Sequence, residues 1–147
     1  KAVGVRKHMR PAEAQALVEG IGGRMVHAFS RKWPGPRVWY RPYTQASREV
    51  FTWLRSFLDG ELGGGYVLER VSIDEAYIDV STPTGGSLGT ATALARRLLP
   101  AMAEATGIRA SVGVAPNRLL AKLASLAAKP PREGVFTVAA TGSVGGA

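Results

Sequence analysis

The sequence of 147 residues contains no cysteine, so disulfides and thiolate metal sites are excluded. No apolar run approaches the ~18 residues that a membrane-spanning helix needs. The first residues carry no signal-peptide core and no initial Met, and residues 139–147 are mostly small. We therefore expect a segment cut at both ends from a longer protein, with no membrane partner.

Acidic residues are the scarcer charged class, with 11 Asp and Glu against 19 Lys and Arg. The formal net charge is +8 in a chain that is 46% hydrophobic, enough apolar residues to bury a core. Such an excess favours a polyanionic partner, nucleic acid first and an anionic membrane surface second. A basic protein that binds neither is the alternative interpretation.

The hydrophobic pattern predicts helices over 11–19, 44–58, 88–105 and 117–128, with Asn117 as an N-cap. Strands are expected over 25–29 and 109–114. A hairpin is expected within 67–81, with strands ending at Ile73 and restarting at Tyr77. Residues 30–42 and 82–86 are interpreted as loops. This alternation predicts an α+β fold, an antiparallel or mixed sheet with helices on one face.

Three predicted helices carry apolar residues at helical spacing. The expected apolar faces are Val50, Phe51, Leu54 and Leu58; Leu94, Leu98 and Met102; and Leu119, Leu120, Leu123, Leu126 and Ala127.

Asp74 and Glu75 are adjacent carboxylates within an otherwise apolar strand segment. Like charges this close raise each other's pKa, and burial adds to the effect, whereas a divalent cation removes both penalties. Carboxylates are ligands that Mg²⁺ prefers, together with waters and substrate phosphates. The alternative is a solvated turn, in which Asp is common. Asp79 is a third acid nearby, which we do not count as a ligand.

A stripe of cations runs along the last predicted helix. Arg118, Lys122, Ser125 and Lys129 are spaced four, three and four residues apart, and no acid interrupts them. The solvated side of an ordinary amphipathic helix would normally mix charges of both signs, so this stripe favours phosphate binding. Lys129, before Pro130, is free to reach a ligand. The basic N-terminal stretch that begins at Lys1 gives a weaker phosphate-binding signal.

Two long segments contain the residues described above: VSIDEAYIDV (71–80), and SVGVAPNRLLAKLAS (111–125) with AKP (128–130). The first resembles the central palm motif of the Y-family translesion DNA polymerases, and the second resembles that family's second motif. Fainter similarity over 4–10 and 40–47 extends the resemblance to nearly the whole chain, as far as about Val138. It implies a ferredoxin-like polymerase palm over 44–138, part of the fingers over 1–43 and a small-residue tail over 139–147.

The resemblance also implies roles for individual residues. Asp74 and Glu75 would be catalytic ligands of Mg²⁺, with Mn²⁺ as the alternative ion. Lys129 and Lys1 would contact the incoming deoxynucleoside triphosphate. Arg118, which replaces a more usual Lys, and Lys122 would contact primer-template DNA. A sliding clamp is a common partner in the family, and its binding segment would lie outside this chain.

Within the family, the Met9-Arg10 element and the basic loop between Phe29 and Tyr40 resemble the eta type more than the bacterial polymerase IV type. The expected location is the nucleus for a eukaryotic eta-type enzyme or the cytoplasm for a prokaryotic one.

The family's first palm strand, with another catalytic Asp and the residue that excludes ribonucleotides, would lie upstream of Lys1. Its absence would leave a strand edge unpaired, so we expect the segment alone to be poorly stable and unable to extend a primer. Two alternatives remain. A non-catalytic DNA-binding module would bind DNA without metal-dependent activity. A nucleotide cyclase is disfavoured because Ser72-Ile73 occupies the place of the paired glycines expected before its acids.

Overall fold

A computed structural model describes residues 3–6, 8–25, 30–32, 36–38, 40–129 and 134–138. The chain divides into two compact units, Lys1–Pro42 and Tyr43–Ala147. Among the described residues, no helix is both long and apolar enough to cross a bilayer.

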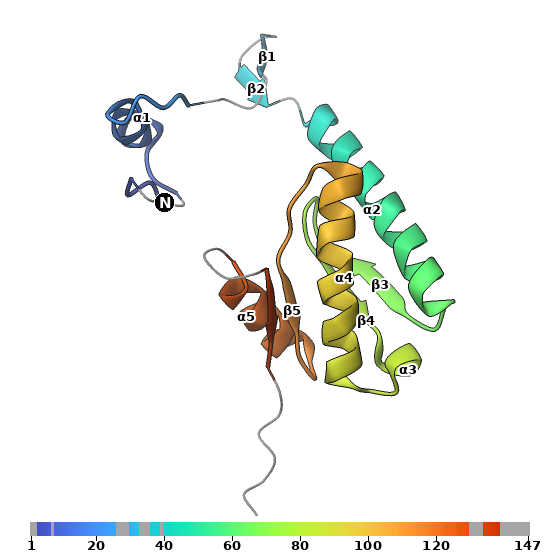
Figure 1. Ribbon diagram of the computed structural model, residues 1–147. Coiled ribbons are helices and arrows are strands. Elements are labelled where there is room, and N and C mark those ends of the chain that lie inside the picture. The colour runs from blue at the N-terminus through green and yellow to red at the C-terminus, as the bar shows by residue number, and fades with distance from the viewer. Residues whose placement is uncertain are drawn as a thin grey trace, which may run out of the picture. The chain divides into compact units, whose positions relative to one another are not determined.

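The described residues of the first unit include helix α1 and a short hairpin. Helix α1 spans Pro11–Glu19, as predicted, with proline at its start. Strands β1 (Ser30–Lys32) and β2 (Pro36–Val38) pair antiparallel (Figure 1). The prediction of a loop over 30–42 is therefore wrong, because short strands with little apolar alternation leave almost no periodic signal. The strand predicted over 25–29 lies largely outside the described residues.

The second unit holds the remaining elements. In chain order they are α2 (Arg41–Leu62, from Tyr43 onward in this unit), β3 (Val67–Arg70), β4 (Ala76–Asp79), α3 (Ser81–Thr84), α4 (Leu88–Thr106), β5 (Val112–Val114), α5 (Arg118–Ala127) and β6 (Val135–Thr137). β3 pairs antiparallel with β4, and β5 pairs parallel with β6. The predicted α+β class with mixed strand pairing is confirmed.

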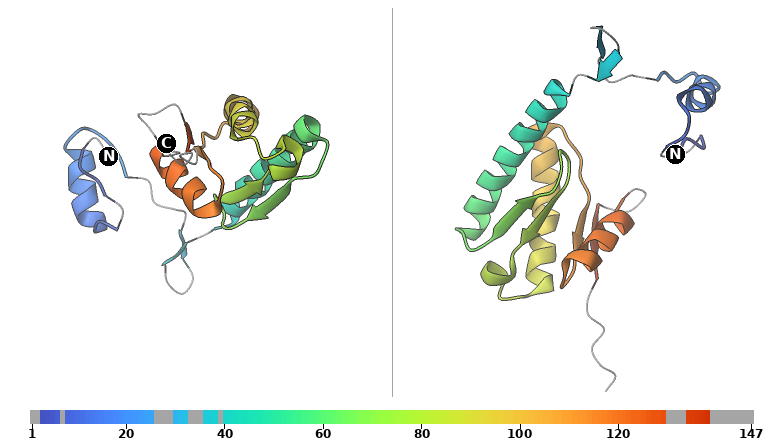
Figure 2. Two further views of the ribbon diagram at one scale, coloured as in Figure 1. Left: turned by 90° about the horizontal axis from the view of Figure 1, so that it is seen from below. Right: turned by 180° about the vertical axis from the view of Figure 1, so that it is seen from behind.

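Helices α2 and α4 lie side by side over the β3–β4 hairpin (Figures 1 and 2). Leu54 and Leu58 of α2 meet Leu94 and Leu98 of α4 to form the buried core. Leu68, Ile78 and Val112 bring the three strands against it. Met102 is also buried, so the apolar face predicted for 88–105 is confirmed.

The β3–β4 hairpin differs from its predicted bounds. The ladder runs from the Val67–Asp79 pair to the Arg70–Ala76 pair, so residues 71–75 form a wider turn than expected. Residues 82–86 were expected to be a loop, but α3 occupies most of that segment.

Helix α5 packs against β5 through small residues rather than leucines. Ala124 and Ala128 are buried, while the relative exposure of Leu119 is 70%. Leu123 and Leu126 of the predicted apolar face are exposed as well, whereas Leu120 and Ala127 are half-buried, so that face is covered only in part. The reason is Gly113, where a Cβ would lie 2.1 Å from the carbonyl oxygen of Ala121. A strand without a side chain at that position admits the α5 main chain.

Candidate active site

The turn between β3 and β4 carries both predicted metal ligands. The main-chain nitrogens of Val71 and Ser72 donate to the carbonyl oxygen of Glu75, at 2.9 and 3.1 Å. The Ser72 hydroxyl donates to Asp74 Oδ1 at 2.7 Å and accepts from the Asp74 amide at 3.3 Å. Asp74 is exposed and Glu75 is half-buried. The carboxylates therefore project from a main chain that is closed by its own hydrogen bonds.

Helix α5 places cations against this hairpin. Lys122 Nζ donates to Glu75 Oε1. One turn earlier, Arg118 Nη2 donates to Glu69 Oε1 at 2.9 Å. The Arg118 guanidinium carbon also lies 4.4 Å from the centre of the Tyr77 ring, a cation–π contact. The structure thus brings together the two motifs that the sequence keeps some forty residues apart.

Hydrogen bonding to Glu75 raises the pKa of Lys122 above its ordinary value. Partial desolvation opposes that shift, while the negative charges of Glu75 and Asp74 add to it. Lys122 is therefore a firmly protonated ammonium, which offsets the repulsion between the two carboxylates. Both Lys122 and Glu75 remain partly open to solvent, with 40% and 35% of their side chains exposed. Water therefore screens this contact, and other charged groups can reach it.

The structure gives less information about the other residues of the predicted phosphate-binding set. Lys129 is exposed just beyond the end of α5, and the described part of the chain gives it no hydrogen bond or ion pair. Ser125, the uncharged member of the stripe, donates its hydroxyl to the carbonyl oxygen of Lys122 at 2.8 Å. Lys1 lies outside the described residues, so its predicted triphosphate contact stays a prediction.

The carboxylate pair fits a hard divalent cation. Asp74 Oδ2 and Glu75 Oε2 have no bonded partner within the described ranges, and Asp74 is open to solvent. Mg²⁺ is usually bound through one or two carboxylates, waters and substrate phosphates. Within those ranges no cluster of three or more potential metal-binding side chains exists. The described residues therefore offer two candidate ligands, and Asp79 is not counted as a third. Its Oδ1 accepts from the Ser81 amide at 2.8 Å.

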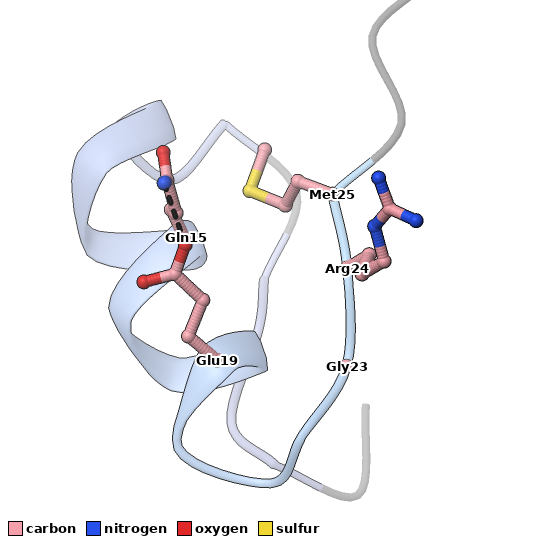
Figure 3. Close-up of a pocket in the computed structure, with 5 residues that line it drawn as sticks. All are labelled: Gln15, Glu19, Gly23, Arg24 and Met25. Atoms are coloured by element: carbon pink, nitrogen blue, oxygen red, sulfur yellow. Dashed lines mark hydrogen bonds between the residues drawn. The ribbon is translucent and has the colours of Figure 1, made fainter.

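The first unit has a hollow of about 150 Å³ beside α1 (Figure 3). It is lined by Gln15, Glu19, Gly23, Arg24 and Met25. Gln15 Nε2 donates to Glu19 Oε1 at 2.7 Å across one turn of the helix. None of the candidate site residues singled out in the sequence lines this hollow.

The model of the impB/mucB/samB family matches residues 1–126, most of the chain. The chain belongs to the impB/mucB/samB family. Curated relatives agree with this membership. The DNA polymerase IV of Aeromonas hydrophila is 38% identical over 120 residues, which are 81% of this chain and 32% of the relative. The DNA polymerase IV of Methanosarcina acetivorans is 36% identical over 89 residues, 60% of this chain and 24% of the relative. The chain thus spans about a quarter to a third of these family members.

Solved structures of the family have the same fold. The insertion ternary complex of Dbh DNA polymerase matches with a TM-score of 0.71 and 26% identity, over 93% of this chain and 34% of that one. A Y-family DNA polymerase chimera of Dbh and Dpo4 matches with a TM-score of 0.65 and 27% identity, over 92% of this chain and 34% of that one. The expectation of a Y-family fold is therefore confirmed.

Sequence reasoning missed two residues that contact the turn carrying Asp74 and Glu75: Ser47 on α2 and Arg70 at the end of β3. A signal for Ser47 was present. It precedes Phe51 by four residues and Leu54 by seven, which places a hydroxyl on the apolar stripe of the helix. A polar group at such a position needs a partner. Arg70 carried no comparable signal, because its partners depend on how α2 packs.

Proposed function

We propose that this chain supplies part of the active site of a translesion DNA polymerase, which joins deoxynucleotides to a primer under the direction of a template. The observation that carries the proposal is the turn with Asp74 and Glu75 held against the cations of α5, in a chain of this family. Relatives named DNA polymerase IV and the ternary complexes of Dbh support the reaction class and the partners, primer-template DNA and a deoxynucleoside triphosphate.

Asp74 and Glu75 hold catalytic Mg²⁺, for which Mn²⁺ can substitute. When bound, the ions supply electrostatic stabilisation for the charge that builds up on the transferred phosphoryl group. Lys122 keeps the Glu75 carboxylate oriented and its charge balanced before substrate arrives. Because this ion pair is partly exposed, breaking it costs little, which would leave the Glu75 carboxylate free to hold an ion and the Lys122 ammonium free to contact the DNA backbone.

The remaining cations bind the polyanionic substrates. Lys129 and Lys1 contact the triphosphate, and Arg118 joins Lys122 in contacting DNA phosphates. Arg118 leaves Glu69 to do so, which its exposed position permits: 62% of its side chain is open to solvent. Each such contact makes DNA affinity more salt-dependent, because binding releases counterions.

Four finer assignments belong to the same proposal. Residues 1–43 form part of the fingers and 44–138 the palm. The chain by itself does not extend primers, because two carboxylates are an incomplete two-metal site. A sliding clamp binds elsewhere in the longer protein.

The eta-type subclass rests on Met9-Arg10 and the loop before Tyr40, whereas the relatives above carry the name DNA polymerase IV. The full-length sequence decides that subclass, and with it a nuclear or cytoplasmic location.

The test uses the longer polymerase that contains this chain. Asp74→Asn should abolish Mg²⁺-dependent primer extension and leave primer-template affinity within about twofold, because it removes one negative charge but no DNA contact. Glu104→Gln on α4, an exposed acid outside the site, is the matched control and should extend normally. Extension by Asp74→Asn at the rate of the control would refute the metal assignment.

A further inference from the structure

Ser47 is a hydroxyl residue buried on the core-facing side of α2. Its exposure is 6%, and no other polar residue in the described part of the second unit is as buried. Its Oγ donates to the carbonyl oxygen of Ile73, the residue directly before Asp74. A buried hydroxyl without a hydrogen-bond partner destabilises the fold. The Ser47 hydroxyl therefore keeps its bond to Ile73 as long as α2 is packed on the core, and this bond holds the turn to the helix.

Arg70 joins the same contact from the end of β3. Its Nη2 donates to Ser47 Oγ at 2.8 Å, and its Nε donates to the carbonyl oxygen of Ser72 at 3.1 Å. The guanidinium carbon lies 4.6 Å from the centre of the Phe51 ring, one helical turn beyond Ser47. The planar guanidinium thus donates one hydrogen bond to α2 and one to the turn, while the Phe51 ring packs against its face.

These contacts hold both peptide groups that precede Asp74. The carbonyl of Ser72 bonds Arg70, and the carbonyl of Ile73 bonds Ser47. On the other side of the turn, the carbonyl of Glu75 accepts the amides of Val71 and Ser72. The main chain that carries the carboxylates is therefore fixed to α2 as well as to its own strands.

We propose that Ser47 and Arg70 act as positioning residues. Together they form a clamp on residues 72–73, which fixes the positions from which the Asp74 and Glu75 carboxylates bind a divalent cation. This rests on the proposed function of those carboxylates. Mg²⁺ demands near-ideal octahedral geometry, so small shifts of a ligand weaken its binding. Removing a group that orients metal ligands typically costs about 10–100-fold in metal affinity or activity.

The first experiment measures the turn itself in the longer polymerase that contains this chain. Amide exchange at Val71 and Ser72, followed by NMR, should accelerate about tenfold or more in Ser47→Ala, and Ser47→Thr, which keeps the hydroxyl, should restore protection. Ser56→Ala is the matched control, an exposed α2 serine whose hydroxyl donates only to Thr52 of the same helix. Exchange in Ser47→Ala equal to that of the control would overturn the clamp.

The second experiment measures the cation in the longer polymerase. The Mg²⁺ concentration for half-maximal primer extension should rise about 10–100-fold in Ser47→Ala and in Arg70→Gln, with KM for DNA unchanged. Arg55→Gln, which removes an exposed arginine on α2, should leave this Mg²⁺ concentration unaltered. Arg70 is exposed, so its replacement opens no cavity in the core. Arg70→Gln therefore still tests the clamp if Ser47→Ala fails to fold.

The outcomes separate the clamp from the proposed function. A lower melting temperature with an unchanged Mg²⁺ midpoint in both variants would make the two residues merely structural and overturn the clamp. If Asp74→Asn also extended primers normally, the proposed function would fail. If Asp74→Asn is inactive while the clamp variants titrate like the controls, the function stands and only the clamp is refuted.

Discussion

Replacing Gly113 tests how closely α5 packs on β5. A Cβ added there would lie 2.1 Å from the carbonyl oxygen of Ala121, 2.3 Å from the nitrogen of Ser125 and 2.8 Å from the carbonyl carbon of Ala124. All three are main-chain atoms, so no side chain can swing away. Ordinary contact begins at 3.4 Å, and bringing the first distance from 2.1 to 3.4 Å moves the helix by about 1.3 Å.

Gly113→Ala should therefore cost about 3 kcal/mol of unfolding free energy, the upper part of the usual range for overpacking. The measurement is urea unfolding of the chain followed by circular dichroism. A retreat of α5 also withdraws Lys122 from Glu75. In the longer polymerase we expect about a hundredfold loss of primer extension, the typical effect of a 1 Å misplacement.

Gly60→Ala is the matched control for this prediction. Gly60 lies in α2, and an added Cβ would meet nothing within 4 Å. Alanine is the better helix former, so this variant should gain about 0.5–1 kcal/mol. If Gly113→Ala were as stable as Gly60→Ala, the close approach of α5 to β5 would be wrong.

Two further predictions concern α5 and its partner on the hairpin. Because the folded pKa of Lys122 is raised, its contact with Glu75 stabilises the fold fully below the ordinary pKa of 10.5, and this stability is lost as pH rises through the folded value. The unfolding free energies of wild type and Glu75→Gln should therefore differ at pH 8 and converge as the pH rises well above 10.5; a gap that persists unchanged to high pH would contradict the pairing. Asn117 Oδ1 accepts the Leu120 amide at 2.9 Å, so Asn117→Ala should cost about 1 kcal/mol in urea unfolding and Asn117→Ser much less. Equal losses in both variants would argue against the cap.

Local chemistry predicted much of this fold from sequence. The periodic leucines of 88–105 have one arrangement that buries them, and Leu94, Leu98 and Met102 are buried as predicted. Asn117 caps its helix because the donor it satisfies lies three residues away. Such features depend on neighbours in sequence, so a single sequence is enough to find them.

The wrong predictions concern elements whose structure depends on what they pack against. The leucines of α5 have helical periodicity, but Gly113 lets alanines pack inward instead, and no pattern within the helix reveals this. Strand β6 was missed because its three residues gain their order from pairing with β5, in which Val112 lies opposite Val135.

The candidate site likewise has a part that the sequence predicted and a part that it did not. Asp74 and Glu75 were found because adjacent acids in an apolar segment are unusual, and the cations of α5 because no acid lies among them. That Lys122 would meet Glu75 depends on the distance between two elements, which the sequence does not contain. The same holds for Arg70, whose partners on α2 and in the turn come together only in the fold.

The most direct test of the proposed metal site is anomalous diffraction at the manganese edge from the longer polymerase bound to primer-template DNA, deoxynucleoside triphosphate and Mn²⁺. We expect an anomalous peak in contact with the carboxylate oxygens of Asp74 and Glu75, with Lys122 moved away from Glu75. Manganese bound elsewhere, with the Lys122–Glu75 ion pair intact in the complete complex, would contradict it.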